Sequence, residues 1–255
     1  MAGRAAKPPR FYFNLRSPYN FFALADLERD HPELLDRLEW RPFWEPDETS
    51  ARLLDEAGGQ FPYTPMTRAK QFYILRDVRR LAADRGLALT WPTDRSPWWE
   101  PAHLTWFLAD DAGLGRQWVA RAGRARWLEG RDICDPATVA ELAAEIGLDA
   151  GAAAAAADGP GLRERGVRAL LDVHRDGVFG VPYFIHGSEP YWGLDRVAEF
   201  AASFADSGLP DAPAGRPAEA ASAEAAPAEA ASAEAGLAVV GAGRTTDMSH
   251  AGGCG

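Results

Sequence analysis

The chain has 255 residues, of which 47% are hydrophobic, and a formal net charge of −10. This length suffices for one large domain or a domain with an insertion, and the negative charge excludes a general nucleic-acid binder because no basic field is available for phosphates. Two cysteines without metal-ligand spacing exclude a disulfide framework, and no apolar run approaches the roughly 18 residues of a membrane span, so we expect a soluble cytoplasmic protein.

The first elements form a β-α-β pattern. Residues 11–15, Phe-Tyr-Phe-Asn-Leu, are short and aromatic, which indicates a strand. Ser17-Pro18 then supplies a helix N-cap and a proline at the first helical position, so a helix is predicted from there to about Asp30. Residues 38–43 alternate in polarity and predict a second strand. Such a unit requires a parallel pair joined by a crossover helix.

The remainder up to residue 206 is helical and then returns to strands. Val181-Pro182 begins a predicted third strand and is a candidate cis peptide. We therefore expect an α/β fold in which residues 10–47 and 176–206 form a thioredoxin-like domain and residues 48–175 an inserted all-helical domain. Apolar periodicity predicts helices over residues 67–83, 101–112, 115–128, 136–146, 162–174 and 194–204, and strands over 180–185 and 191–193.

Residues 207–255 differ in composition from everything before them. Residues 217–226 and 227–236 are a near-perfect ten-residue repeat of Ala, Glu, Ser and Pro. Two such repeats cannot bury a core, so we predict a solvated, disordered linker leading to a tail that contains Cys254.

Four stretches of the chain resemble sequence motifs of a known family, and they occur in the same order as in that family. They are "FYFNLRSPYNFFA", "TRAKQFYILRDVRRLA", "WLEGRDICD" and "GVFGVPYFIHGSEPYWGLDR". Over residues 10–205 the chain is similar to the 2-hydroxychromene-2-carboxylate isomerases, which belong with kappa-class glutathione transferases in the DsbA-like thioredoxin superfamily. The resemblance implies glutathione or another small thiol as cofactor, a small aromatic or conjugated substrate, and a homodimer.

Ser17 is the first candidate site residue. In the turn Ser17-Pro18-Tyr19-Asn20 it stands where a thiol-redox protein carries Cys-Pro-x-Cys. The resemblance implies that Ser17 hydrogen-bonds the sulfur of a bound thiol, with Tyr19 and Asn20 beside it. A hydroxyl at a helix N-terminus lies where backbone N–H groups and the helix dipole stabilise an anion, and the thiolate is the reactive form of a thiol. The alternative is that Ser17 is only an N-cap.

The resemblance also implies residues that would contact the parts of glutathione other than its sulfur. Val181 and Pro182 match a cis-proline turn that pairs with the cysteinyl part of glutathione, and a strand-entry proline is the alternative. Lys70 matches a lysine that meets the thiol or the substrate, although an exposed helix lysine would look the same. Asp195 fits a partner for the γ-glutamyl ammonium. Two departures weaken this side: Leu194 replaces a small polar residue, and residues 59–63 lack a family asparagine.

Tryptophans are concentrated in the predicted helical domain. Trp98 and Trp99 could sandwich a flat substrate, although such side chains more often belong to the core. Three more tryptophans would add to an aromatic pocket: Trp91, Trp106 and Trp127.

The two cysteines suggest different roles. Cys134 is predicted to be a buried, inert thiol. Cys254-Gly255 is chemically the C-terminal half of glutathione on a flexible arm, so Cys254 is a candidate tethered thiol that replaces free glutathione. A docking role for the tail is the alternative. We expect no metal centre, because Met248, His250 and Cys254 make a poor soft-metal site.

Three functions are weighed. The leading prediction is a thiol-dependent isomerase or transferase acting on a small aromatic or conjugated substrate. The second is a non-catalytic thioredoxin-like carrier that presents its Cys-containing tail. A dithiol-disulfide oxidoreductase is nearly excluded, because two-electron exchange at this turn needs sulfurs that Ser17 and Asn20 lack.

Overall fold

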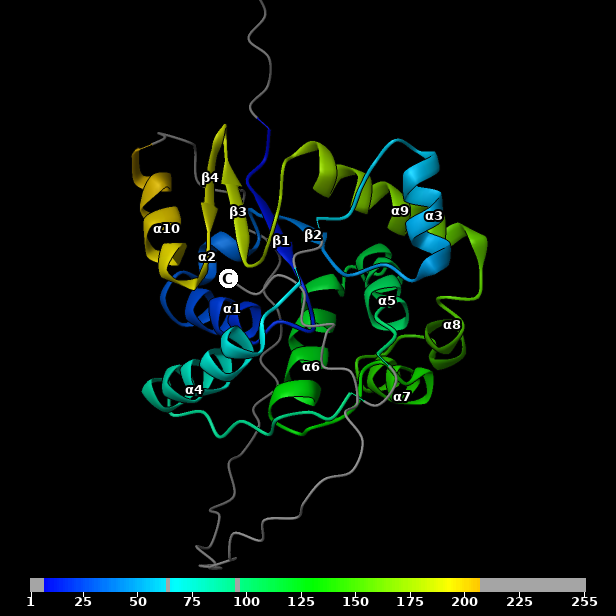
Figure 1. The fold of residues 1–255 in the computed structure, drawn as a ribbon, viewed down its shortest axis with the longest axis horizontal. Helices are drawn as coiled ribbons and strands as arrows, with labels where there is room; N and C mark the ends of the chain where they lie inside the picture. The colour runs from blue at the N-terminus through cyan, green and yellow to red at the C-terminus, as the bar shows by residue number, and fades with distance from the viewer. Residues whose placement is uncertain (1–6, 63–64, 95–96, 207–255) are drawn as a thin grey trace, which may run out of the picture.

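The computed structural model describes residues 7–62, 65–94 and 97–206. Its four-stranded sheet has the strand order β2-β1-β3-β4 (Figure 1). The chain enters through β1 (Arg10–Phe13), α1 (Pro18–Asp30), a short α2 (Pro32–Leu35) and β2 (Glu39–Pro42). Strands β1 and β2 are parallel, as the β-α-β pattern predicted.

Helices occupy the chain between β2 and β3. The long predicted helices are present, and sequence periodicity missed two short ones, α3 and α8. In chain order the helices of the described residues in this stretch are α3 (Glu48–Glu56), α4 (Arg68–Asp84), α5 (Glu100–Asp111), α6 (Gly115–Trp127), α7 (Pro136–Glu145), α8 (Ala150–Ala154) and α9 (Pro160–Arg175).

The chain then returns to the sheet as a hairpin. Strand β3 (Tyr183–His186) lies antiparallel to both β1 and β4 (Glu189–Trp192). A 3₁₀ turn, η1 (Leu194–Arg196), leads into α10 (Val197–Asp206), so the predicted closing helix begins three residues later than expected. The α/β layer with a helical segment inserted between its halves is confirmed.

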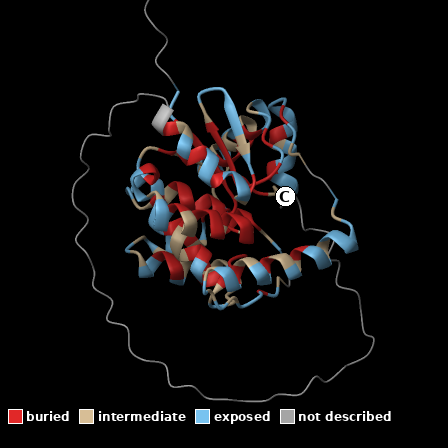
Figure 2. Cartoon of the chain, turned by 90° about the vertical axis from the view of Figure 1, so that its left-hand side faces the viewer, coloured by how far each residue is buried: buried red, intermediate tan, exposed pale blue. Residues whose placement is uncertain are grey.

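The two faces of the sheet bury different clusters, because successive side chains of a strand point to opposite faces. Phe11 stacks on Phe184 with ring centroids 4.7 Å apart, and Phe13 meets Trp106 of α5. Tyr12, between them in sequence, packs in a second cluster with the start of β3. The Phe11 and Phe13 cluster continues into α5 and α6, so sheet and helices share one core, buried at the centre of Figure 2.

The division of residues 10–206 into two domains stays a prediction, and residues 207–255 lie outside the described part of the chain. Among the described helices, none is long and apolar enough to cross a membrane.

Candidate functional site

Ser17 lies at the junction of β1 and α1. Its backbone is extended, its Oγ accepts a hydrogen bond from the Asn20 N–H at 3.3 Å, and Pro18 begins the helix. The predicted N-cap is therefore confirmed. Ser17 is only 1% exposed, so its hydroxyl sits in a dry environment at the positive dipole end of a 13-residue helix.

Two buried asparagines fix the loop that presents Ser17. The Asn14 backbone N–H donates to Asn20 Oδ1 at 3.1 Å, and the Arg16 N–H donates to Asn14 Oδ1 at 2.7 Å. The Ser17 N–H completes the turn by donating to the Asn14 carbonyl at 3.1 Å. The backbone N–H groups of Asn14, Arg16 and Ser17 are therefore satisfied within the turn, which makes the loop a rigid platform.

Asn20 also offers a donor that the described residues leave unused. Its Oδ1 faces the Asn14 N–H, so the amide orientation is assigned and Nδ2 points elsewhere. Asn20 is 5% exposed, and its Nδ2 has no partner among the described residues. A buried donor without an acceptor costs about 1–3 kcal/mol, so this position calls for a hydrogen-bond acceptor.

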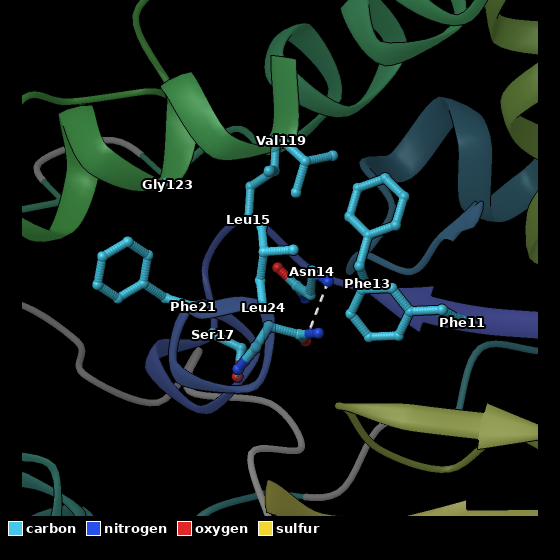
Figure 3. A pocket seen from close by; sticks show the side chains of 10 residues that line it. Phe11, Phe13, Asn14, Leu15, Ser17, Phe21, Leu24, Val119 and Gly123 are labelled. Carbon is cyan, nitrogen blue, oxygen red and sulfur yellow. Dashed lines mark hydrogen bonds between the residues drawn. The ribbon is translucent and has the colours of Figure 1, made fainter. Parts of the chain in front are cut away.

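A small cavity lies beside Ser17 and Asn20. Its volume of about 20 Å³ holds one water-sized atom (Figure 3). Apart from the polar groups of the turn, its wall is apolar and comes from β1, α1 and α6, with Phe11, Phe13, Leu15, Phe21, Leu24, Val119 and Gly123. The site thus combines hydrogen-bonding groups with an apolar wall, which suits a large, polarisable sulfur atom.

His103, on α5, supports the turn from behind. Its Nδ1 lies 2.7 Å from the Trp99 carbonyl and must carry the proton, so Nε2 is left to accept the Leu15 N–H at 3.2 Å. Burial lowers the pKa of His103 to about 3, and the ring stacks on Trp44 with centroids 5.3 Å apart. This neutral histidine holds the loop two residues before Ser17. Sequence reasoning missed it, because a single histidine in a helix carries no signal of its partner.

Tyr19 is directed away from the cavity. Its hydroxyl donates to Asp77 on α4 at 2.9 Å, and its ring packs with Ile74 and Val78. Tyr19 therefore ties α1 to α4. Lys70 lies one turn before Ile74 on the same side of α4 and is exposed, with no side-chain hydrogen bond or ion pair described for it. The thiol- or substrate-binding roles of Tyr19 and Lys70 stay predictions.

The peptide bond between Val181 and Pro182 is cis, as predicted. Val181 is buried beside Tyr12, and the Gly193 N–H donates to the Pro182 carbonyl at 3.0 Å. Asp195 follows on η1, 74% exposed and 3.8 Å from the Arg196 guanidinium. Neither Val181, Pro182 nor Asp195 is among the residues that line the Ser17 cavity.

The tryptophans do not gather around Ser17. Trp99 is buried between the guanidinium groups of Arg16 and Arg126, each 5.0 Å from its ring centre. Trp98 is half-buried and donates from Nε1 to Asp47 at 3.2 Å. None of these tryptophans lines the cavity, because Trp99, Trp106 and Trp127 are buried in the core and Trp91 stands 47% exposed. The substrate-binding roles of Trp98 and Trp99 stay predictions.

Cys134 is the only cysteine in the described residues. It is buried, and burial raises the pKa of its thiol to about 12, in agreement with an inert core cysteine. Asp94 and Asp132 lie near Cys134, in an arrangement that could hold a metal ion. Arg126 forms a salt bridge with Asp94 at 2.7 Å, so we interpret Asp94 as the partner of an ion pair. Cys254 and the other tail candidates lie outside the described residues.

The fold and the turn define a class: a thioredoxin-like protein with a serine at the N-terminus of its first helix. A family model described as the DSBA-like thioredoxin domain matches residues 10–205. The chain therefore belongs to the DSBA-like thioredoxin domain family.

The proteins similar to this chain include both isomerases and a disulfide reductase. A 2-hydroxychromene-2-carboxylate isomerase of Sphingobium xenophagum is 28% identical over 192 residues, 73% of this chain and 92% of that protein. A solved 2-hydroxychromene-2-carboxylate isomerase superposes with a TM-score of 0.61 at 22% identity, over 78% of this chain and 94% of the other. The cytosolic disulfide reductase DsbM from Pseudomonas aeruginosa, solved with GSH, gives 0.52 at 20%, over 78% and 97%. The solved structures establish the shared fold alone.

Proposed function

We propose that this protein is a thiol-dependent isomerase or transferase that acts on a small aromatic or conjugated substrate. The observation that carries the proposal is the turn itself: Ser17 caps α1 beside the Asn20 Nδ2 donor, which has no partner among the described residues, in a cavity of about 20 Å³. The distant isomerase relative supports the same reaction class.

Glutathione, or another small thiol, fits the turn at its sulfur end. An anionic sulfur would receive hydrogen bonds from the Ser17 hydroxyl and the Asn20 amide, and the positive end of the α1 dipole favours its negative charge. When bound, the thiol supplies a sulfur nucleophile for a conjugated double bond. The protein's own residues orient that sulfur, hold it in the ionised form and keep water out of the cavity.

Disulfide exchange is disfavoured although the family contains oxidoreductases. Such exchange requires attack by a thiolate on a disulfide sulfur, and the turn residues Ser17 and Asn20 have oxygen and nitrogen instead. The described part of the chain contains only Cys134, which is buried with a raised pKa. Thiol-assisted chemistry without net oxidation is the function consistent with these residues.

The test uses 2-hydroxychromene-2-carboxylate as probe substrate, with and without glutathione. We expect isomerisation that depends on Ser17 and is stimulated by thiol in a Cys254→Ser protein. A wild-type protein that shows neither turnover of this probe nor thermal stabilisation by any small thiol would instead favour the carrier function.

Two further properties belong to the same proposal. We place the protein in the cytoplasm, where thiols stay reduced, and we expect a homodimer by resemblance to kappa-class relatives. Light scattering of the purified full chain measures the oligomeric state directly, and a mass of one chain would reject the dimer.

A further inference from the structure

The outward side of helix α4 differs in charge from the chain as a whole. The helix packs on α1 through Ile74 and Val78 and lies at the edge of the molecule (Figure 1). Opposite these two residues, helical spacing places the exposed side chains in one continuous stripe, with Asp77 and Asp84 at its margin. We call this stripe the α4 face, and it consists of Arg68, Ala69, Phe72, Tyr73, Arg76, Arg79, Arg80 and Ala83. It contains four arginines and no acidic residue, although the net charge of the chain is −10.

Most arginines of the α4 face have no counter-ion among the described residues. Arg68, Arg76 and Arg79 form no ion pair there, whereas Arg80 pairs with Asp77 at 3.0 Å. A guanidinium carries five N–H donors in a planar fork that matches the geometry of a carboxylate. Three such forks on one helix, without an anion, form a local cationic surface that attracts negatively charged groups.

Two aromatic side chains lie among these arginines. Phe72 is 50% exposed and Tyr73 59% exposed, which is high for side chains with such large apolar rings. The Arg68 guanidinium lies 5.3 Å from the Phe72 ring centre, and the Arg80 guanidinium lies 5.8 Å from the Tyr73 ring centre. Tyrosine and arginine are the residue types enriched among the side chains that dominate binding energy at protein interfaces. The α4 face therefore combines apolar contact area with cationic hydrogen-bond donors.

We propose that the α4 face binds an acidic segment of a partner protein. The carboxylates of that segment pair with Arg68, Arg76 and Arg79, and its apolar side chains cover Phe72 and Tyr73. The three arginines span about 16 Å of helix, so the segment presents its carboxylates over about the same length. None of these side chains lines the Ser17 cavity, so the inference stands apart from the proposed function.

The charges favour such a segment over other partners. A second copy that docked through the same face would bring arginines against arginines, and like charges repel. The net charge of −10 opposes the approach of the whole protein to a nucleic acid or to an anionic membrane. A short acidic segment carries few charges and meets the arginines at close range, where their attraction is strongest.

The experiment measures how tightly the full-length protein binds a fluorescent synthetic peptide that repeats Glu-Glu-Leu-Phe three times, by fluorescence anisotropy. We expect binding that weakens as the salt concentration rises, because the contacts are charged and close to solvent. The double variant Arg76→Gln/Arg79→Gln should weaken binding at least about tenfold, and Phe72→Ala at least about fivefold. The matched control is Arg168→Gln/Arg175→Gln on α9. It removes two exposed arginines that also lack an ion pair among the described residues, and it should change the affinity by less than about twofold.

Several results would overturn the inference. The wild type could fail to bind the acidic peptide at low salt, or could bind equally well a peptide in which glutamine replaces every glutamate. The α9 control could lose as much affinity as the α4 variant, which would leave only net charge as the cause. Binding to vesicles that contain phosphatidylserine, or self-association in sedimentation experiments, would assign the face to a membrane or to a second copy if Arg76→Gln/Arg79→Gln abolished it. Thermal denaturation checks that each variant is folded, which is expected because the substituted side chains are exposed.

Discussion

The two ends of the candidate site are built differently. At the sulfur end, Ser17, Asn20 and His103 are 1%, 5% and 0% exposed, and hydrogen bonds from β1, α1 and α5 fix them in place. At the predicted peptide end, Lys70 and Asp195 are exposed, and their glutathione-binding roles stay predictions. Buried dipoles act in a low dielectric and need no reorganisation, whereas exposed charges are screened by water. Catalytic power should therefore depend on the first end.

The largest effect is expected at Ser17. Ser17→Ala removes the hydroxyl donor and should lower the thiol-dependent rate by about 10²–10³-fold, the usual loss for one preorganised donor. The same change removes the N-cap of α1, which costs about 1 kcal/mol of stability. Steady-state kinetics together with thermal denaturation separate the two losses.

Ser17→Asp is the matched variant for this separation. The carboxylate still caps the Asn20 N–H, but it has no O–H to donate and repels a thiolate. Stability near wild type with lost activity would identify the hydroxyl as the functional group. If Ser17→Asp keeps full activity, Ser17 serves only as a cap.

A second large effect is expected behind the turn. His103→Leu leaves the Leu15 N–H buried without an acceptor and should destabilise the protein by about 1–3 kcal/mol. Because the loop before Ser17 loses its anchor, kcat should fall more than the thiol KM changes. His103→Gln, which retains an acceptor, should recover part of both losses; equal defects in the two variants would contradict a hydrogen-bonding role.

Glu100 lies three residues before His103 on α5. Its protonation makes the stability of this buried region depend on pH. Burial raises the pKa of Glu100 to about 7 from 4.5, and its Oε1 accepts the Asp47 N–H at 2.8 Å. The unfolded state releases its proton first, so stability is lost as the pH rises from 4.5 through 7. Glu100→Gln keeps the acceptor and should be more stable than wild type by roughly 3 kcal/mol at about pH 8.

The difference between Glu100→Gln and wild type should vanish below about pH 4.5, where both states of the wild type are protonated. Urea denaturation of the two proteins at several pH values measures the difference in their free energies of unfolding, both at high pH and at low pH. A difference that does not change with pH would show that the pKa of Glu100 is the same in the folded and unfolded states and is not raised by burial.

The smallest effects are expected at the peptide end. Lys70→Gln and Asp195→Asn should each change the KM for added glutathione by less than about fivefold in the Cys254→Ser protein, since an exposed charge contributes at most about 1 kcal/mol. Neither change should alter kcat. A loss comparable to that of Ser17→Ala at either position would erase the contrast between the two ends.

Local patterns predicted the fold well, because the determining residues are neighbours in sequence. Ser17-Pro18 specifies its own helix start, and apolar periodicity marks α4 to α7 and α9. The short helices α3 and α8 escaped because few turns leave little periodicity. The site was predictable at Ser17 for the same local reason.

The rest of the site depends on contacts far apart in the chain. His103 and Leu15 are 88 positions apart, and nothing in either segment announces the hydrogen bond between them. From its sequence context Trp99 could be a substrate platform or a core residue, and nothing in that context predicts the guanidinium groups of Arg16 and Arg126 that lie over its ring. The hydrogen bond from the Tyr19 hydroxyl to Asp77, 58 positions away, likewise has no signal in the sequence.

We expect the Ser17 turn to stabilise a bound thiolate. Ultraviolet absorbance of the thiolate, titrated against pH for glutathione bound to the Cys254→Ser protein, measures this stabilisation. The pKa of the bound thiol should lie at least about one unit below that of free glutathione and should return to the free value when Ser17→Ala is added. A bound-thiol pKa equal to the free value with Ser17 in place would contradict it.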